Sequence, residues 1–516
     1  MNAAKDRSPF IYAIVGILFL FLSTTVPLSA QTNWTNDLIE RINQYAVWDP
    51  ADFILDKLCK NRIVMLGDGG HGDPLYSRVV ISSLNHWISA WERDEVRDGL
   101  AGLPPKIFLF LEMDSVRADA LKQYFQTGNP IQTIAPVRFL GDQFTTGTLE
   151  FYNDLRMLSL RVDKYNRSNR RKSPLSFDVV GPEKVIDVSN WTIAKRDSFF
   201  VWQRDEYSSA KVIDLLERVS DAKALLYYGD AHLIAEKTQK SERANSLGYF
   251  LAHYLKESFA AKGGAYTCGQ LEVSANPRYY HGISKIGKTF AINNSILTGI
   301  AIEPNASFQP RNGTIFHFAA PRHSAHLSTL LSENLVDYIL DTIDAYKDNA
   351  NEFYRGLLDT WLFYLSNLAV VDFNQLNHAN ASAVDSTIKA WKKWRSSTRI
   401  DLVEELSSLR YFKRYVDLIR ASDQRKATWY QMRLGQLTGF KVWFPNDVSP
   451  QVRADSIWTY INRYRKPIVT QSLINMLWIG SKAENEKAQI VLKKETGQNC
   501  RNAKEWTEWW EAQQSN

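Results

Sequence analysis

The first half of the chain alternates short, fully apolar runs with longer stretches whose apolar residues recur every three or four positions. Apolar runs bounded by turns are typical of strands in a parallel sheet, because helices cover both faces of such a sheet. The longer stretches predict helices at 74–91 and 204–219. Strands are expected at 63–66, 107–111, 177–180 and 224–228. This alternation predicts an α/β domain with a mainly parallel sheet flanked by helices.

The second half of the chain has a different pattern. Segments between Thr289 and Ala320 are β-rich and punctuated by Asn, Pro and Gly, and beyond about His326 apolar residues recur at helical spacing. Two segments of this tail, 437–458 and 495–510, each place a Thr-Gly pair ahead of tryptophan, which forms a weak repeat. Such a repeat resembles HEAT-like helical arrays, with a plain helical bundle as the alternative. An all-α C-terminal region is therefore expected.

The N-terminus has the layout of a secretory signal peptide. Lys5 and Arg7 precede an apolar run over 10–22, and residues 23–30 are small or polar, with cleavage expected after Ala30. The apolar run is short for a membrane span, so export to the periplasm or the exterior is predicted, with no stable span after cleavage. An uncleaved anchor is the alternative. The predicted division is a signal peptide at 1–30, an α/β domain at 31–325 and a helical domain at 326–516.

Composition excludes several functional classes. The net charge of +6 arises from 62 basic and 56 acidic residues that are dispersed along the 516-residue chain, so a nucleic-acid partner is not expected. The three cysteines, Cys59, Cys268 and Cys500, allow one disulfide at most and form no Cys-x-x-Cys pair. Neither a disulfide scaffold nor a cysteine-based zinc or catalytic site is expected.

Two loops each bring an acid and a histidine to the end of a predicted strand. The first carries Asp68 and His71 among glycines, the second carries His232 after Gly229, and Glu112 ends the strand at 107–111. The carboxyl ends of parallel strands meet at one edge of a sheet, so these side chains are expected in one polar site for a small-molecule substrate or ligand.

Two arginines are expected to join this site. Arg78 lies about one turn into the helix that follows the first loop, where it is expected to pair with Asp68 or Glu112 or to bind an oxyanion. Arg204 begins the helix before the second loop, although the positive end of a helix dipole disfavours an arginine there. A carboxylate partner for Arg204 is therefore predicted.

The order of these motifs, over about 61–233, resembles that of the erythromycin esterase-like family. More broadly it is similar to the superfamily that includes the haem-binding ChaN proteins and the Tiki and TraB proteins. In this resemblance His71 matches the histidine proposed to activate water in the esterases, and Glu112 matches the carboxylate after the second strand. Asp68 takes the place of the family's usual Glu, which keeps the charge on a shorter side chain.

The rest of the resemblance lies around the second loop. Arg204 and Asp205 match the family's Arg-Asp helix start, His232 matches the final histidine, and Arg78 matches the helix arginine if a gap of two residues is allowed. Gly229 stands where the macrolide esterases have an earlier histidine. This departure favours the Gly-x-x-His pattern of the wider superfamily over macrolide ester cleavage in particular.

The resemblance and the residues together imply an exported hydrolase. A water held by His71 and a carboxylate is expected to be deprotonated by His71 or His232 and to attack an ester or related carbonyl, while Arg78 or Arg204 stabilises the oxyanion. The chain has no Gly-x-Ser-x-Gly motif, which disfavours an acyl-enzyme of the α/β-hydrolase type.

Other functions stay open at this point. A divalent metal such as zinc or manganese would find mixed oxygen and nitrogen ligands in one set of residues: Asp68, His71, Glu112 and His232. A ChaN-like protein without hydrolytic activity would instead bind haem or another bulky ligand, with Tyr227, Tyr228 and His71 as contacts. The helical C-terminal region is a candidate surface for a protein partner.

Overall fold

A computed structural model describes the chain over these residues: 39–68, 74–93, 102–129, 149–169, 174–185, 192, 194–195, 198–199, 203–229, 232–233, 246–252, 268–274, 290–293, 313–316, 331–346, 365, 370, 381–397, 401–440, 444–445 and 447–514. The signal peptide predicted at 1–30 and the domain boundary predicted at 325–326 lie outside these ranges. Within them, no helix combines the length and hydropathy that a membrane crossing requires.

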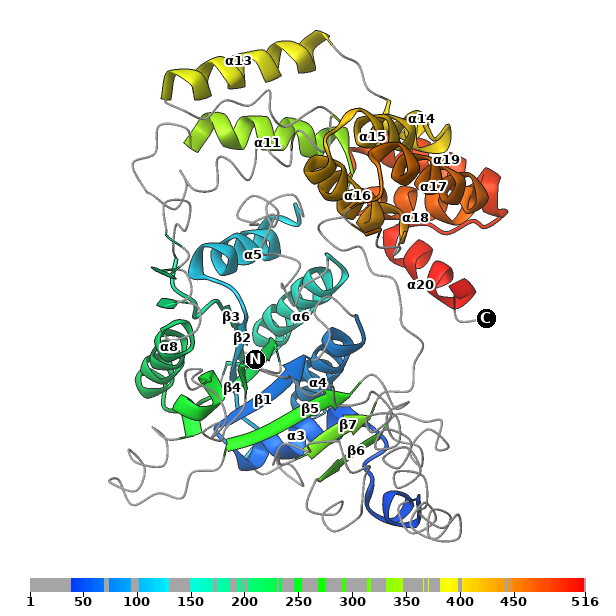
Figure 1. Ribbon diagram of the computed structural model, residues 1–516. Coiled ribbons are helices and arrows are strands. Elements are labelled where there is room, and N and C mark those ends of the chain that lie inside the picture. Colours follow the sequence, from blue (N-terminus) through cyan, green and yellow to red (C-terminus); the bar gives the residue numbers. More distant parts are fainter. Residues whose placement is uncertain are drawn as a thin grey trace, which may run out of the picture.

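The described strands form one seven-stranded sheet in the order β3-β2-β4-β1-β5-β7-β6 (Figure 1). All neighbours are parallel except β6, which runs antiparallel to β7 at the edge. The bounds are β1 Ile63–Asp68, β2 Lys106–Leu111, β3 Ser176–Val180, β4 Ala222–Gly229, β5 Cys268–Ser274, β6 Phe290–Asn293 and β7 Gly313–Phe316. The four expected strands are present, β6 and β7 extend the sheet, and β5 was not predicted.

Helices connect and cover the strands of the sheet. Their bounds are α3 Pro50–Lys60, α4 Pro74–Glu92, α5 Ser115–Thr127, α6 Leu149–Ser168 and α8 Arg204–Arg218. Strand side chains alternate between two buried clusters. Leu66 and Tyr227 pack with α3, α4 and α6, whereas Met65 and Tyr228 pack with α8. This period of two is the geometry of a strand, and it determines which side chains share a face of the sheet.

The C-terminal part is helical, which together with the parallel sheet confirms the predicted fold class. Its described helices are α11 Glu333–Tyr346, α13 Ala381–Ser397, α14 Leu402–Ser407, α15 Arg410–Ala421, α16 Gln424–Thr438, α17 Pro450–Arg463, α18 Arg465–Leu477, α19 Lys482–Thr496 and α20 Ala503–Gln514. Figure 1 shows α14 to α19 gathered together, with α20 following them. The helix α20 contacts the α/β part directly, because Lys504 pairs with Asp154 of α6 at 3.2 Å.

The two Thr-Gly pairs that suggested a repeat have the same local function. Thr438 ends α16 and Thr496 ends α19, and each threonine hydroxyl donates to the carbonyl four residues earlier. Gly439 and Gly497 follow with φ of 74° and 76°, a left-handed conformation that favours glycine at a helix end. Shared capping chemistry accounts for the recurring pair, and a HEAT-like array stays a prediction.

Candidate functional site

The carboxyl edge of the sheet places several polar residues together. Glu112 follows β2 directly, Glu183 follows β3 by three residues, and Gly229 is the last residue of β4. Phe108 and Phe110 of β2 belong to the buried cluster on the α8 face. Glu112 continues their alternation, so its carboxylate lies on the face that α8 covers, next to the start of that helix.

Arg204, the first residue of α8, binds two of these carboxylates. Its Nη2 donates to Glu112 Oε1 at 2.7 Å and also contacts Glu183 Oε1, to which Nε donates at 3.1 Å. Arg204 has the carboxylate partners that its unfavourable position at a helix start predicts. The two negative charges raise the pKa of Arg204 although burial opposes the shift, so the guanidinium stays charged.

His232 forms a dyad with Asp205, the second residue of α8. Its Nδ1 lies 2.9 Å from both carboxylate oxygens of Asp205, and Leu247 N donates to Asp205 Oδ2 at 3.1 Å. The other ring nitrogen, Nε2, lies 3.3 Å from Arg204 Nη1 and 3.6 Å from Glu112 Oε1. A proton on Nδ1 suits this arrangement because Asp205 accepts it, which leaves the Nε2 lone pair toward Arg204.

Neighbouring charges shift the pKa of His232 and of Glu112. Burial works to lower the pKa of His232, but the hydrogen bond and charge of Asp205 and the charge of Glu112 outweigh it and raise that pKa. Burial works to raise the pKa of Glu112, and the positive charges of Arg204 and His232 with the Gly229 N–H bond lower it overall. Glu112 Oε2 accepts that backbone bond at 2.8 Å. Glu112 is therefore a carboxylate at neutral pH.

Tyr228 adds an unused hydrogen-bond donor. Its ring meets the His232 ring edge-on, with 6.4 Å between centroids. Its hydroxyl is buried and has no hydrogen-bond partner among the described residues. Burial and the nearby charges of Glu183 and Glu112 raise its pKa well above the ordinary value, so the hydroxyl keeps its proton. An unpaired buried O–H carries a desolvation cost that a substrate oxygen would remove.

Glu183 was missed by the sequence analysis, and Asp205 entered it only through a motif match. Glu183 follows the predicted strand at 177–180 as Glu112 follows its own, and that shared position was the available signal. The loop that carries Glu183 lies close to the segment after β2, because a Cβ on Gly181 would lie 2.1 Å from the Asp114 carbonyl oxygen. Glycine is required at position 181 for this contact.

The first predicted loop is described only in part. Asp68 is the last residue of β1 and pairs in register with Gly229, so its backbone lies beside the second loop. The side chain of Asp68 and the whole of His71 lie outside the described residues. Their roles stay predictions.

Arg78 was expected to pair with Asp68 or Glu112 or to bind an oxyanion, and its described partners are two other carboxylates. Its Nη2 binds Glu511 of α20 at 2.8 Å and Glu150 of α6 at 3.2 Å. The physical reason is the face of the sheet: Val79 and Val80 of α4 pack in the cluster shared with α3 and α6, on the side opposite α8. The structure therefore uses Arg78 to join the C-terminal helix to the α/β part.

The geometry also bears on the predicted metal and haem contacts. Glu112 and His232, the described side chains of the four-residue metal set, both face the Arg204 guanidinium, whose positive charge disfavours a cation beside them. Tyr227 lies on the other face of the sheet and packs against Phe151, with ring centroids 5.8 Å apart. Tyr227 and Tyr228 therefore do not converge on one ligand.

Comparisons with known proteins add a single structural match. No family model matches the chain. No curated protein matches it either. Among solved structures, a mutant of the erythromycin esterase EreC in its open conformation aligns with a TM-score of 0.32 and 12% identity, covering 52% of this chain and 93% of that one. A match at this level assigns neither family nor activity.

Proposed function

We propose that the chain is an exported hydrolase that activates water with a histidine paired to a carboxylate and acts on an ester or related carbonyl of a small molecule. The observation that carries the proposal is the His232–Asp205 dyad, which lies against Arg204. The His232 and Arg204 side chains are 23% and 17% exposed, so solvent and substrate reach both.

Each residue has a defined part in the proposed reaction. Asp205 holds the proton on Nδ1, so Nε2 of His232 takes a proton from water as the water oxygen attacks the carbonyl carbon. Arg204 Nη1 moves from Nε2 to the developing oxyanion and stabilises it. The tetrahedral intermediate then collapses to the acid, and Nε2–H protonates the departing alkoxide.

Glu112 and Glu183 are positioning residues in this scheme. Both bind the Arg204 guanidinium, and Glu112 is also fixed by the Gly229 N–H. We propose His71 and Asp68 as further members of the site, because their loop follows β1 beside Gly229. The signal-peptide pattern at 1–30 supports export, which N-terminal sequencing of the secreted protein tests.

The test is ester and lactone turnover by the purified mature protein, using a panel of small chromogenic esters. His232→Ala is expected to lower kcat/KM about 10²- to 10⁴-fold, the range for loss of a general base. Asp214→Asn, at an exposed position of α8, is the control and keeps full turnover.

Two outcomes would refute the proposal. One is a folded wild-type protein that turns over no member of the panel. The other is turnover that His232→Ala leaves intact, since contaminating esterase or another site would then be responsible.

A further inference from the structure

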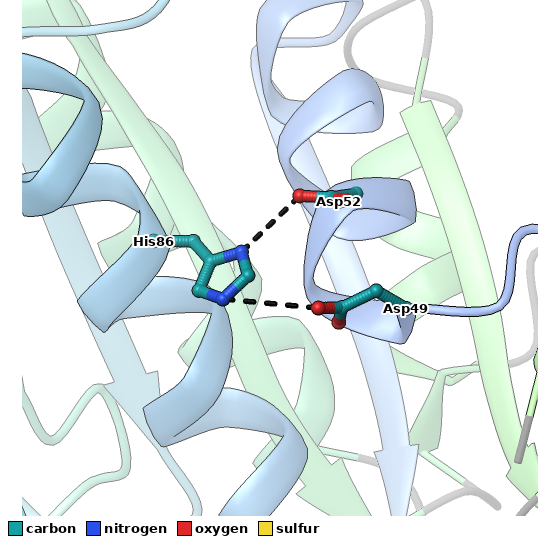
Figure 2. Close-up of side chains that lie close together, drawn as sticks. All are labelled: Asp49, Asp52 and His86. Carbon is teal, nitrogen blue, oxygen red and sulfur yellow. Dashed lines mark hydrogen bonds and ion pairs between the residues drawn. The ribbon is translucent and has the colours of Figure 1, made fainter.

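Asp49, Asp52 and His86 form a cluster of metal-ligating side chains outside the site described above. His86 Nδ1 lies 3.1 Å from Asp52 Oδ1, and Nε2 lies 3.8 Å from Asp49 Oδ2. Figure 2 shows the imidazole of α4 facing both carboxylates of the α3 start. One ligand atom from each residue falls within 4.8 Å of the other two, the single such group among the described residues.

Packed helices hold the three donors in place. Asp49 is the N-cap of α3, and its side chain accepts the Ala51 N–H at 2.8 Å through Oδ1, which directs Oδ2 to His86. Asp52 lies three residues later, on the same face of the helix. His86 lies on α4 between buried Leu84 and Trp87. The donors therefore come from two helices that pack together, and all three remain open to solvent.

We propose that this cluster binds a divalent transition ion, with zinc as the best match. Two carboxylate oxygens and one imidazole nitrogen are ligands that Zn²⁺ accepts, and solvent supplies the fourth. Tetrahedral ligands about 2.1 Å from zinc lie about 3.4 Å apart, and the three ligand atoms here already lie within 4.8 Å of one another. The nitrogen donor and the low ligand number argue against calcium and magnesium, which prefer oxygen ligands.

Bound zinc would link α3 to α4 through its ligands. Both helices pack on the same face of the sheet, so an ion that binds only the folded state raises the stability of that layer by mass action.

Calorimetric titration of the full mature chain with ZnCl₂ at pH 7.5 tests the site, because a metal binds the deprotonated form of its ligands. His86→Ala and Asp52→Asn are each expected to weaken zinc binding at least about tenfold. Asp49→Asn does the same while keeping the N-cap, because asparagine caps as well as aspartate. Asp56→Asn is the matched control, since Asp56 lies on the same helix and pairs with Lys60, and it is not one of the three ligand candidates.

Thermal unfolding gives a second measurement. Zinc is expected to raise the Tm of the wild type and of Asp56→Asn, and to raise the Tm of the three cluster variants less at the same zinc concentration. Absence of saturable binding at millimolar zinc would overturn the proposal. Binding that survives both His86→Ala and Asp52→Asn would also overturn it, and loss of that binding in His232→Ala would then place the ion at the other site.

Discussion

The Arg204 ion pairs allow a quantitative test of how the site is held together. Replacing Arg204 with methionine keeps a long side chain and leaves Glu112, whose side chain is 4% exposed, without its main cation. Removing one partner of a buried ion pair costs about 3–5 kcal/mol, because the remaining charge is buried and uncompensated. Arg204 is itself partly exposed, so we expect a loss near the lower end, about 3 kcal/mol of unfolding free energy.

The matched control is Arg218→Met on the same helix. Arg218 pairs with Asp214, and both side chains are more than half exposed. Exposed pairs of this kind contribute about 0–1 kcal/mol. Urea unfolding at pH 7, followed by circular dichroism, measures both variants. If Arg204→Met loses no more unfolding free energy than Arg218→Met, the view that the Arg204 guanidinium compensates a buried carboxylate is refuted.

The same two proteins can also be compared at lower pH. In the wild type the pKa of Glu112 is lowered, so its contribution to stability is present above its unfolded pKa and is lost as pH falls. Without Arg204 the burial of Glu112 dominates and raises that pKa, so protonation relieves the cost. The stability gap between wild type and Arg204→Met should therefore narrow between pH 7 and about pH 5.

Two further predictions concern the dyad and the C-terminal helix. Asp205 raises the pKa of His232, so Nε2 should act as a base only above that raised pKa. In Asp205→Asn the inflection in the pH profile of kcat/KM should therefore move to lower pH. An inflection at the same pH in both proteins would contradict His232 as the base. Glu511→Ala removes a charged hydrogen bond to Arg78, so hydrogen exchange in α20 should report about 2 kcal/mol less protection. Hydrogen exchange in α8 is the internal reference. An equal loss of protection in α8 and α20 would contradict the view that Glu511 holds α20 in place locally.

The sequence by itself determined the strands and the edge where the site forms. Each of the four strands predicted from apolar runs is present, because such a run has its lowest free energy when both faces are buried. Right-handed crossovers then bring the ends of those strands to one edge, which is how Glu112, Arg204 and His232 were expected together. The two Thr-Gly pairs were interpreted from sequence as a repeat, and the structure shows that each glycine ends a helix.

Only the tertiary structure decided which side chains pair. Arg78 binds Glu511, a residue 433 positions away, and no local pattern encodes such a contact. Arg78 and Glu112 lie on opposite faces of the sheet, because α4 packs on one face and α8 on the other. The Asp52–His86 contact likewise joins two helices across 34 residues. Periodicity is a local property of the chain, so the four strands were predictable. The partner of Arg78 and the Asp52–His86 contact depend on how distant elements pack, so they were not predictable.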